Sequence, residues 1–408
     1  MGVMLFPRWS SMMTSVALFG GRDVKRDILV YADVNLNLID GSAVWLASLT
    51  EMLSLESHLN VHVLLKCPLT DGKLVKKLLS KENIRFIDPW SSGEYPTTSR
   101  IIAHSEKMVL DTEAAASIIQ IISQEMQPHR ILVRGPDILY RICGERDISS
   151  KLIAYITNPP SHSDFSGMQQ MLTIHNSSVL TLLQTPMAVN SFVRICGARA
   201  KRRKIDILNP MVADDNFEYP LDRKRIHLSL GYSGKFSPPY MIEEMLSSFK
   251  SIQNRHGNAT FHVVGDKMHN RPFVEGFEER VKTALGENPG VKWYGGVSRE
   301  RANQLMSEVM VASGWRDVSF DDTVEISTKI LEYAALGIPV LMRPAPVQVE
   351  VFGADLPTWV ESDLEFERMF ELLITDKLLY REVANKMRES VRRYSMRATI
   401  ERLRRHLL

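Results

Sequence analysis

Apolar residues along this chain of 408 residues gather in short runs, and each run is followed by a longer stretch in which they recur at helical spacing. This alternation is typical of parallel strands joined by crossover helices. In the first half, the runs predict strands at 28–31, 61–65, 84–87, 131–133, 152–156, 179–183 and 205–208. Between them, the periodicity predicts helices around 42–55, 71–81, 111–126 and 186–196.

The pattern stops at residues 209–224, a polar stretch with two prolines, and restarts at residue 226. A polar, proline-containing stretch between two periodic regions indicates a linker. The second half predicts strands at 226–230, 260–264, 291–294, 309–312 and 338–342. It predicts helices near 238–254, 273–285, 298–307, 325–336 and 362–374, and terminal helices in the last thirty residues.

These elements predict an α/β protein of two doubly wound, Rossmann-like domains that face a cleft. The expected organisation is a flexible leader or weak surface segment at 1–26, an N-terminal domain at 27–208, a linker at 209–224, a C-terminal domain at 225–385 and terminal helices at 386–408. We expect the terminal helices to cross back to the first domain. Ligands of open parallel sheets bind beyond the carboxyl ends of the strands, so functional residues are expected in the loops there.

Composition narrows the class of protein. The 50 basic and 48 acidic residues nearly cancel to a formal charge of +2, which argues against a general nucleic-acid binder. The charge is unevenly distributed: residues 1–205 carry a net +5 and residues 206–408 a net −3. The two halves are therefore expected to meet different partners. Three cysteines in a chain of this length indicate a reducing compartment rather than a disulfide framework. The longest apolar runs are too short for a membrane-spanning helix.

The densest chemical signal is TVEISTKILEYAALGIPVL at residues 323–341. The spacing of Glu325, Lys329 and Glu332 puts all three near one helical face or its first turns. At the start of a helix, such groups can bind sugar hydroxyls while the positive helix end faces a diphosphate. A solvated helix with a Glu–Lys pair is the simpler interpretation of the triplet alone.

Glycine turns follow three of the predicted strands in the second half. Gly234 allows the backbone to approach a phosphate closely, and Lys235 can neutralise it. The other two turns are at Gly265 and at Gly296–Val297. Each turn alone also fits an ordinary strand-to-helix connection.

In order and spacing, these segments of residues 226–343 resemble the donor-binding half of retaining, nucleotide-sugar-dependent glycosyltransferases of the GT-B fold, family four. The resemblance implies that Glu325 contacts the donor sugar, Glu332 the ribose, and Lys235 with Lys329 the diphosphate. It also implies that Gly265 lies in the donor site and that Gly296 and Val297 receive the base. The chain departs from the family pattern twice: its two glutamates are seven rather than eight positions apart, and Tyr240 replaces a second lysine.

The first half resembles the family only in its pattern of elements. The resemblance implies a small loop near donor and acceptor, for which Gly41 and Ser42 are candidates, and a histidine near the donor sugar, for which His162 is the first candidate and His104 the second. Arg134, after the predicted strand 131–133, is a candidate acceptor contact. A plain glycine turn and an inert loop histidine are the alternatives.

One strong cluster of charge occurs, and all its members are basic: Arg199, Lys201, Arg202, Arg203 and Lys204. A solvated face is its common explanation. The functional alternative is attraction to anionic lipid headgroups, to a pyrophosphate-linked lipid or to an acidic polysaccharide. Nucleic acid is disfavoured because no aromatic residues interleave with the cluster.

We therefore expect a cytoplasmic glycosyltransferase, able to sit at the inner face of the membrane, that moves a sugar from a UDP- or GDP-linked donor to a glycan or lipid-linked acceptor with retention of configuration. No metal or other cofactor is predicted, because GT-B enzymes stabilise the leaving diphosphate with side chains and helix dipoles. Two alternatives remain: a sugar-nucleotide epimerase on the same fold, and a non-catalytic subunit that binds nucleotide sugars or glycans.

Overall fold

In the computed structural model, which describes residues 25–38, 40–91, 97–102, 108–160 and 164–408, the strands form two separate sheets, and every pairing within them is parallel. The first sheet has the order β3-β2-β1-β4-β5-β6-β7 and the second the order β10-β9-β8-β11-β12. The strands of the first sheet are β1 (Arg26–Ala32), β2 (Leu59–Leu64), β3 (Ile84–Ile87), β4 (Arg130–Arg134), β5 (Leu152–Ile156), β6 (Leu180–Leu183) and β7 (Ile205–Ile207). Those of the second are β8 (Ile226–Ser233), β9 (Thr260–Val264), β10 (Val291–Trp293), β11 (Val309–Ser313) and β12 (Val340–Leu341).

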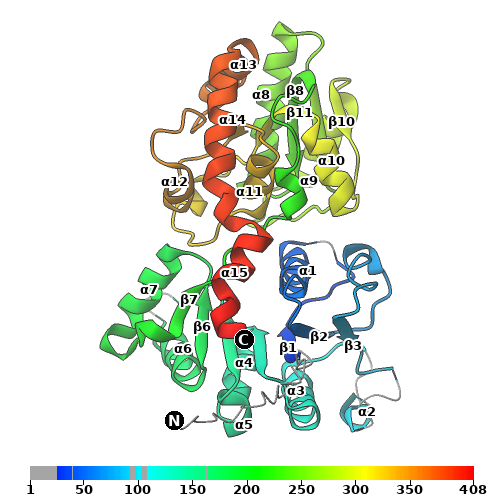
Figure 1. Cartoon of the computed structure of the whole chain (residues 1–408). Coiled ribbons are helices and arrows are strands. Elements are labelled where there is room, and N and C mark those ends of the chain that lie inside the picture. The colour runs from blue at the N-terminus through cyan, green and yellow to red at the C-terminus, as the bar shows by residue number, and fades with distance from the viewer. Residues whose placement is uncertain (1–24, 39, 92–96, 103–107, 161–163) are drawn as a thin grey trace, which may run out of the picture.

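Helices connect the strands of each sheet (Figure 1). Those of the first half are α1 (Gly41–Ser54), α2 (Thr98–Ile102), α3 (Thr112–Met126), α4 (Pro136–Ile142), α5 (Arg146–Ser149), α6 (Phe165–Ser177) and α7 (Pro186–Cys196). Those of the second half are α8 (Ile242–Arg255), α9 (Phe277–Glu287), α10 (Arg299–Ser307), α11 (Thr328–Ala335), α12 (Pro346–Phe352), α13 (Asp363–Thr375), α14 (Lys377–Val391) and α15 (Met396–Leu407). The predicted fold class, two doubly wound α/β domains of the GT-B type, is confirmed.

The first sheet buries both of its faces, as the nearly continuous apolar strands predict. One face packs on α1 and on the C-terminal helix α15, and the other face packs on α3, α4, α6 and α7. The helix α15 starts beside the second domain and ends against the first (Figure 1), with Ile400, Leu403 and Leu407 buried in the first domain. The expected return of the chain to the first domain is thus observed.

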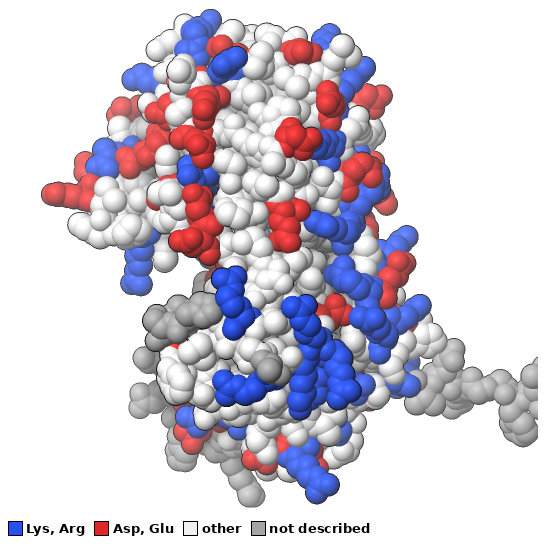
Figure 2. Space-filling model, turned by 90° about the vertical axis from the view of Figure 1, so that its left-hand side faces the viewer, with Lys and Arg blue, Asp and Glu red and all other residues white. Residues whose placement is uncertain are grey.

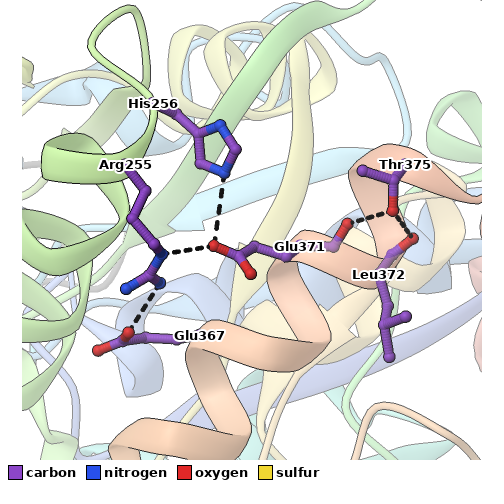
Figure 3. Close-up of polar contacts among 6 residues, drawn as sticks. All are labelled: Arg255, His256, Glu367, Glu371, Leu372 and Thr375. Atoms are coloured by element: carbon purple, nitrogen blue, oxygen red, sulfur yellow. Dashed lines mark hydrogen bonds and ion pairs between the residues drawn. The ribbon is translucent and has the colours of Figure 1, made fainter.

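The second sheet and its helices form a single core that includes most of the buried face of α14. On its surface, α8 and α13 are joined by an ion network around Arg255, the last residue of α8 (Figure 3). Arg255 donates to Glu371 at 2.7 Å and to Glu367 at 2.8 Å, while His256 lies 3.4 Å from Glu371. A cation at the end of a helix is favourable because the helix dipole is negative there.

The helix predicted at 71–81 is wrong. The structure has only a single 3-10 turn at Gly72–Leu74, followed by separate turns. Only Val75 and Leu78 of residues 71–81 are buried, whereas a helix of this length depends on the packing of an apolar face for its stability. The Asn37 side chain accepts hydrogen bonds from the backbone N–H groups of Thr70 and Asp71 and so fixes the start of this segment.

The helix predicted at 325–336 begins later, at Thr328. The first domain holds the residues before it outside the helix: Thr185 donates through Oγ1 to the Val324 carbonyl at 2.9 Å, and the Ile326 N–H donates to Gln184 at 3.1 Å. Glu325 therefore lies in an interdomain loop, not on the helix.

No helix of the described residues is long and apolar enough to cross a membrane. The predicted leader falls at residues 1–26, of which 1–24 lie outside the described residues.

Candidate functional site

The order of each sheet reverses between two adjacent strands, and ligands of doubly wound folds bind at such a point. In the first sheet these strands are β1 and β4, and in the second they are β8 and β11. The carboxyl edges of the two sheets face each other, because loops that follow β5 and β6 contact residues 324–326 of the second domain. The predicted donor-site residues 234, 235, 265, 296, 297, 325, 329 and 332 and the predicted acceptor-side residues 41, 42 and 134 end or follow strands at these two edges.

The three glycine turns of the second domain lie side by side. The Gly234 N–H donates to the Val264 carbonyl at 2.9 Å, and the Gly265 N–H donates to the Gly295 carbonyl at 2.8 Å. A Cβ at Gly265 would lie 2.0 Å from the Gly234 carbonyl oxygen, and one at Gly296 would lie 2.2 Å from Asp266. The positive φ of Gly234 (152°) and Gly265 (135°) also disfavours any other residue.

Three cations converge beside these turns. Lys329, Lys235 and Arg316 all lie near the ring of Tyr240, at 5.0, 5.1 and 5.0 Å from its centroid. The Lys329 Nζ is also 4.1 Å from the centroid of the Tyr232 ring. The structure thus brings together both lysines that were predicted to bind the diphosphate.

The Lys329 ammonium is the most constrained of the three. Its Nζ is buried and makes no hydrogen bond to any described residue. Burial lowers its pKa well below the ordinary value, and the charges of Arg316 and Lys235 lower it further, whereas Glu332 opposes the shift. A buried cation without an anionic partner is costly, so this cluster is suited to an anion from outside the protein.

Sequence reasoning missed Arg316. It follows β11 by three residues and Gly314 by two, whereas Lys235 follows β8 by two residues and Gly234 by one. A cation shortly after a glycine at both strands of the switch point was the available signal. Arg316 lies 5.0 Å from the centroid of the Tyr240 ring, as does Lys329.

Glu332 is held by an arginine. Arg299 donates to Glu332 Oε1 through Nε at 2.9 Å and Nη2 at 2.7 Å. Arg299 is the first residue of α10 and follows the turn of Gly296 and Val297, so the predicted ribose and base contacts adjoin each other. Val297 is partly buried against the core of the second domain.

Glu325 reaches the first domain. Its carboxylate accepts a hydrogen bond of 2.7 Å from Asn158 Nδ2, in the loop after β5. The prediction placed it with Lys329 and Glu332 near one helical face or in the first turns of the helix. It is wrong for Glu325, because the contacts of Val324 and Ile326 keep this residue before α11.

The predicted residues of the first domain also meet. Arg134, at the end of β4, donates through Nη2 to Ser42 Oγ at 3.1 Å. Asp40 caps α1 by accepting from the N–H groups of Ser42 and Ala43 at 3.0 and 2.9 Å. Gly41 is exposed, and a Cβ there would have nothing within 4 Å.

Arg134 has hydrogen-bond partners for only some of its guanidinium N–H groups. Its guanidinium stacks 4.8 Å from the centroid of the Trp45 ring, and Nη1 is buried without a partner among the described residues. Burial lowers its pKa, and the opposing charges that act on it include those of Glu325 and Asp40. The two domains thus influence each other electrostatically at this point.

Both candidate histidines, His162 and His104, lie outside the described residues. Among the described residues, no group of three or more His, Cys, Asp or Glu side chains is arranged to hold a metal ion.

The basic segment 199–204 lies on the first domain, between α7 and β7. Arg199, Lys201, Arg202 and Arg203 are exposed, whereas Lys204 donates to the Ser178 carbonyl at 2.8 Å. The sequence has no acidic residue between Asp164 and Asp206. Figure 2 shows many basic side chains on the first domain, the lower one in this view, whereas acidic and basic side chains are mixed on the second.

No protein-family model matches this chain, and no curated protein matches it either. Similar solved structures include HepE of Anabaena in complex with UDP and glucose (13% identity, TM-score 0.64, covering 94% of this chain and 99% of that one). They also include a glycosyltransferase from Rickettsia africae (15% identity, TM-score 0.63, 94% and 98%) and a variant of TarM from S. aureus with fondaparinux, alpha-GlcNAc-glycerol and UDP (8% identity, TM-score 0.65, 94% and 99%). At these identities the likeness shows the two-domain fold and nothing finer.

Proposed function

We propose that this protein is a glycosyltransferase that uses a nucleoside-diphosphate sugar. The observation that carries the proposal is the cluster of Lys235, Lys329 and Arg316 at the carboxyl ends of β8 and β11, with a buried and unpartnered ammonium at its centre. A diphosphate is an anion that such a cluster can bind. The UDP named for two of the structurally similar proteins supports the assignment.

In the proposed mechanism, the protein supplies charge stabilisation and orientation. Lys235, Lys329 and Arg316 stabilise the negative charge that develops on the diphosphate as its bond to the sugar breaks. The positive end of the α11 dipole adds to this stabilisation. The Ser327 side chain makes no capping hydrogen bond to the first N–H groups of α11 and so does not compete for them. Glu325 and Arg134, from opposite domains, position the sugar and the acceptor.

The finer assignments rest on the resemblance to family four. We propose retention of anomeric configuration, a UDP- or GDP-linked donor and no required metal. Early products analysed by NMR should keep the donor configuration, and activity should survive a chelator. An inverted product or a loss of activity with the chelator would contradict the respective assignment.

For the acceptor, we propose a glycan or a lipid-linked saccharide, with Arg199, Lys201, Arg202 and Arg203 drawing the protein to an anionic surface at the inner face of the membrane. Co-sedimentation with vesicles that contain anionic lipid, but not with neutral vesicles, tests this part. The comparison variant replaces these four residues by glutamine. Equal binding of the wild type to both kinds of vesicle would contradict it.

The central test measures nucleoside diphosphate release and thermal shifts with UDP, GDP and their common sugars. The variants Lys235→Ala, Lys329→Met and Arg316→Ala should each lose nucleotide binding and turnover, whereas Lys250→Ala, an exposed cation on α8, should behave as the wild type. If no nucleotide shifts the transition at millimolar concentration, the proposal is wrong. Free sugar as the product, without an acceptor, would instead indicate an epimerase, and binding without turnover a non-catalytic subunit.

A further inference from the structure

Arg299 is the side chain that joins the predicted nucleoside site to the first domain. In addition to its two bonds to Glu332 Oε1, it donates through Nη1 to Ser48 Oγ at 2.7 Å. Ser48 lies on α1 and is only 2% exposed, and the side chains of Arg299 and Glu332 are 16% and 14% exposed. A partly buried guanidinium therefore bridges two domains at the residue expected to hold the ribose.

The geometry of this bridge leaves one oxygen of Glu332 available. Both bonds from Arg299 go to Oε1, so Oε2 is not engaged by the guanidinium. Two charge-assisted bonds to one oxygen hold the position of that oxygen and restrict the rotamer of the side chain. The second carboxylate oxygen, beside the turn of Gly296, is then a suitable acceptor for a sugar hydroxyl.

We propose that Arg299 is a positioning residue for nucleoside recognition: it orients Glu332 so that Oε2 accepts from a ribose hydroxyl, and through Ser48 it makes this orientation depend on contact between the domains. The inference rests on the proposed function of the cleft. Because coupling between binding and domain contact is reciprocal, a nucleotide on the second domain also strengthens the contact of Arg299 with α1.

A purely structural ion pair would behave differently. Loss of such a pair would lower stability, but it would not change how the protein distinguishes ribose from deoxyribose. Discrimination between UDP and 2′-deoxy-UDP therefore separates the two roles, and inorganic pyrophosphate reports on the cation cluster alone.

The experiment measures the affinities of these three compounds for the wild type, Arg299→Gln, Arg299→Lys and Ser48→Ala. A hydrogen bond to a charged group predicts that the wild type binds UDP about 10- to 100-fold more tightly than 2′-deoxy-UDP. Arg299→Gln should lose most of this ratio and keep its affinity for pyrophosphate, while Ser48→Ala should lose part of it. Arg301→Gln, on the exposed side of the same helix, is the matched control and should keep the full ratio.

Hydrogen exchange tests the link to the first domain. UDP should slow exchange in α1 of the wild type, and Ser48→Ala should abolish this slowing while the slowing in α11 remains. If Arg299→Gln does not fold, Arg299→Lys, which cannot form the same pair of bonds, takes its place. The inference would be overturned if the Arg299 variants kept the wild-type ratio of affinities for UDP and 2′-deoxy-UDP. It would also be overturned if UDP still slowed hydrogen exchange in α1 of Ser48→Ala. Neither result would contradict the proposed function. If the wild type binds none of UDP, GDP and pyrophosphate, the proposed function falls and this inference falls with it.

Discussion

Lys329 carries the largest electrostatic cost at the candidate site, because its ammonium is buried among two other cations and two aromatic rings. A buried cation destabilises the folded state unless it is paired. The cluster is therefore a place where stability is given up for the binding of an anion, as is common at functional sites.

The variant Lys329→Met should be more stable than the wild type at neutral pH, and the difference should shrink as pH rises. The folded state has the lower pKa, so between the folded and unfolded pKa values the unfolded chain binds more protons and the unfolding free energy of the wild type increases with pH. In Lys329→Met the titrating group is absent, so the unfolding free energy should lose this increase with pH. Urea unfolding from pH 6 to 9.5 measures it, and Lys250→Met, an exposed lysine, should leave the pH slope unchanged. If the unfolding free energies of the wild type and Lys329→Met changed in parallel with pH, folding would not lower the pKa of Lys329, and the prediction would be wrong.

Nucleotide binding should take up a proton at pH values where the free protein holds Lys329 partly neutral. The diphosphate favours the charged ammonium and so raises its pKa in the complex. Calorimetry with UDP or GDP in two buffers of different ionisation enthalpy measures the number of protons, and the affinity should fall as pH increases through this range. Equal apparent enthalpies in both buffers across the range would contradict the prediction.

At the scale of elements, the glycine turns explain why the loops after β8 and β9 lie so close together. The turns after β8 and β9 touch through their backbones, and a side chain on Gly265 would meet the Gly234 carbonyl. The position of the cation cluster depends on these turns, because Gly234 also lies against the end of Lys329.

Gly265→Ala should therefore lower the unfolding free energy by about 1–3 kcal/mol and weaken nucleotide binding as well. The control is Gly257→Ala, where an added Cβ meets nothing within 4 Å, and it should stay within about 0.5 kcal/mol of the wild type. Urea unfolding midpoints and a thermal-shift titration with UDP and GDP measure the two effects. The turn would not be constrained as described if Gly265→Ala matched the control.

The strands and the longer helices could be predicted because their apolar periodicity is strong: the strands at 84–87 and 152–156 and the helix at 186–196 have the predicted bounds. Elements with a weaker pattern could not. Neither the short helix α4 nor α6, whose 13 residues are largely polar and include a glycine, was among the predicted helices. In the segment 71–81 the residue types favour a helix, but only Val75 and Leu78 are buried. The start of α11 is set by contacts from Gln184 and Thr185, which lie about 140 positions earlier in the chain.

In the candidate site too, residues could be predicted only where they follow a local sequence pattern. Lys235 and Lys329 could be found from their motifs, because each follows a local pattern of turn or helix. Arg316 has only a weaker signal, a glycine that follows a strand and precedes the arginine by two positions. Arg299 has no such pattern, and the bond between Arg299 and Ser48 joins residues 251 positions apart. Contacts between domains depend on packing that no local spacing encodes.

At the scale of the molecule, the C-terminal helix connects the two domains. The chain leaves the core of the second domain after α14, and α15 then completes the core of the first domain through Ile400, Leu403 and Leu407. Arg404 of α15 also pairs with Glu56, which is 2% exposed in the loop after α1. Because α1 also carries Ser48, this helix supports the surface that Arg299 contacts.

Leu403→Ala should therefore destabilise the first domain, although it lies five residues before Leu408, the last residue of the sequence. Replacing a buried leucine by alanine costs about 2–5 kcal/mol. Hydrogen exchange should accelerate in β1 and β2 more than in β8 and β9, since the side chain packs in the cluster on the first sheet. Leu378→Ala on α14, where the side chain is 78% exposed, should leave both sheets unchanged. If hydrogen exchange accelerated equally in the two sheets, the two domains would unfold as one unit. The helix α15 would then stabilise the whole molecule rather than the first domain alone.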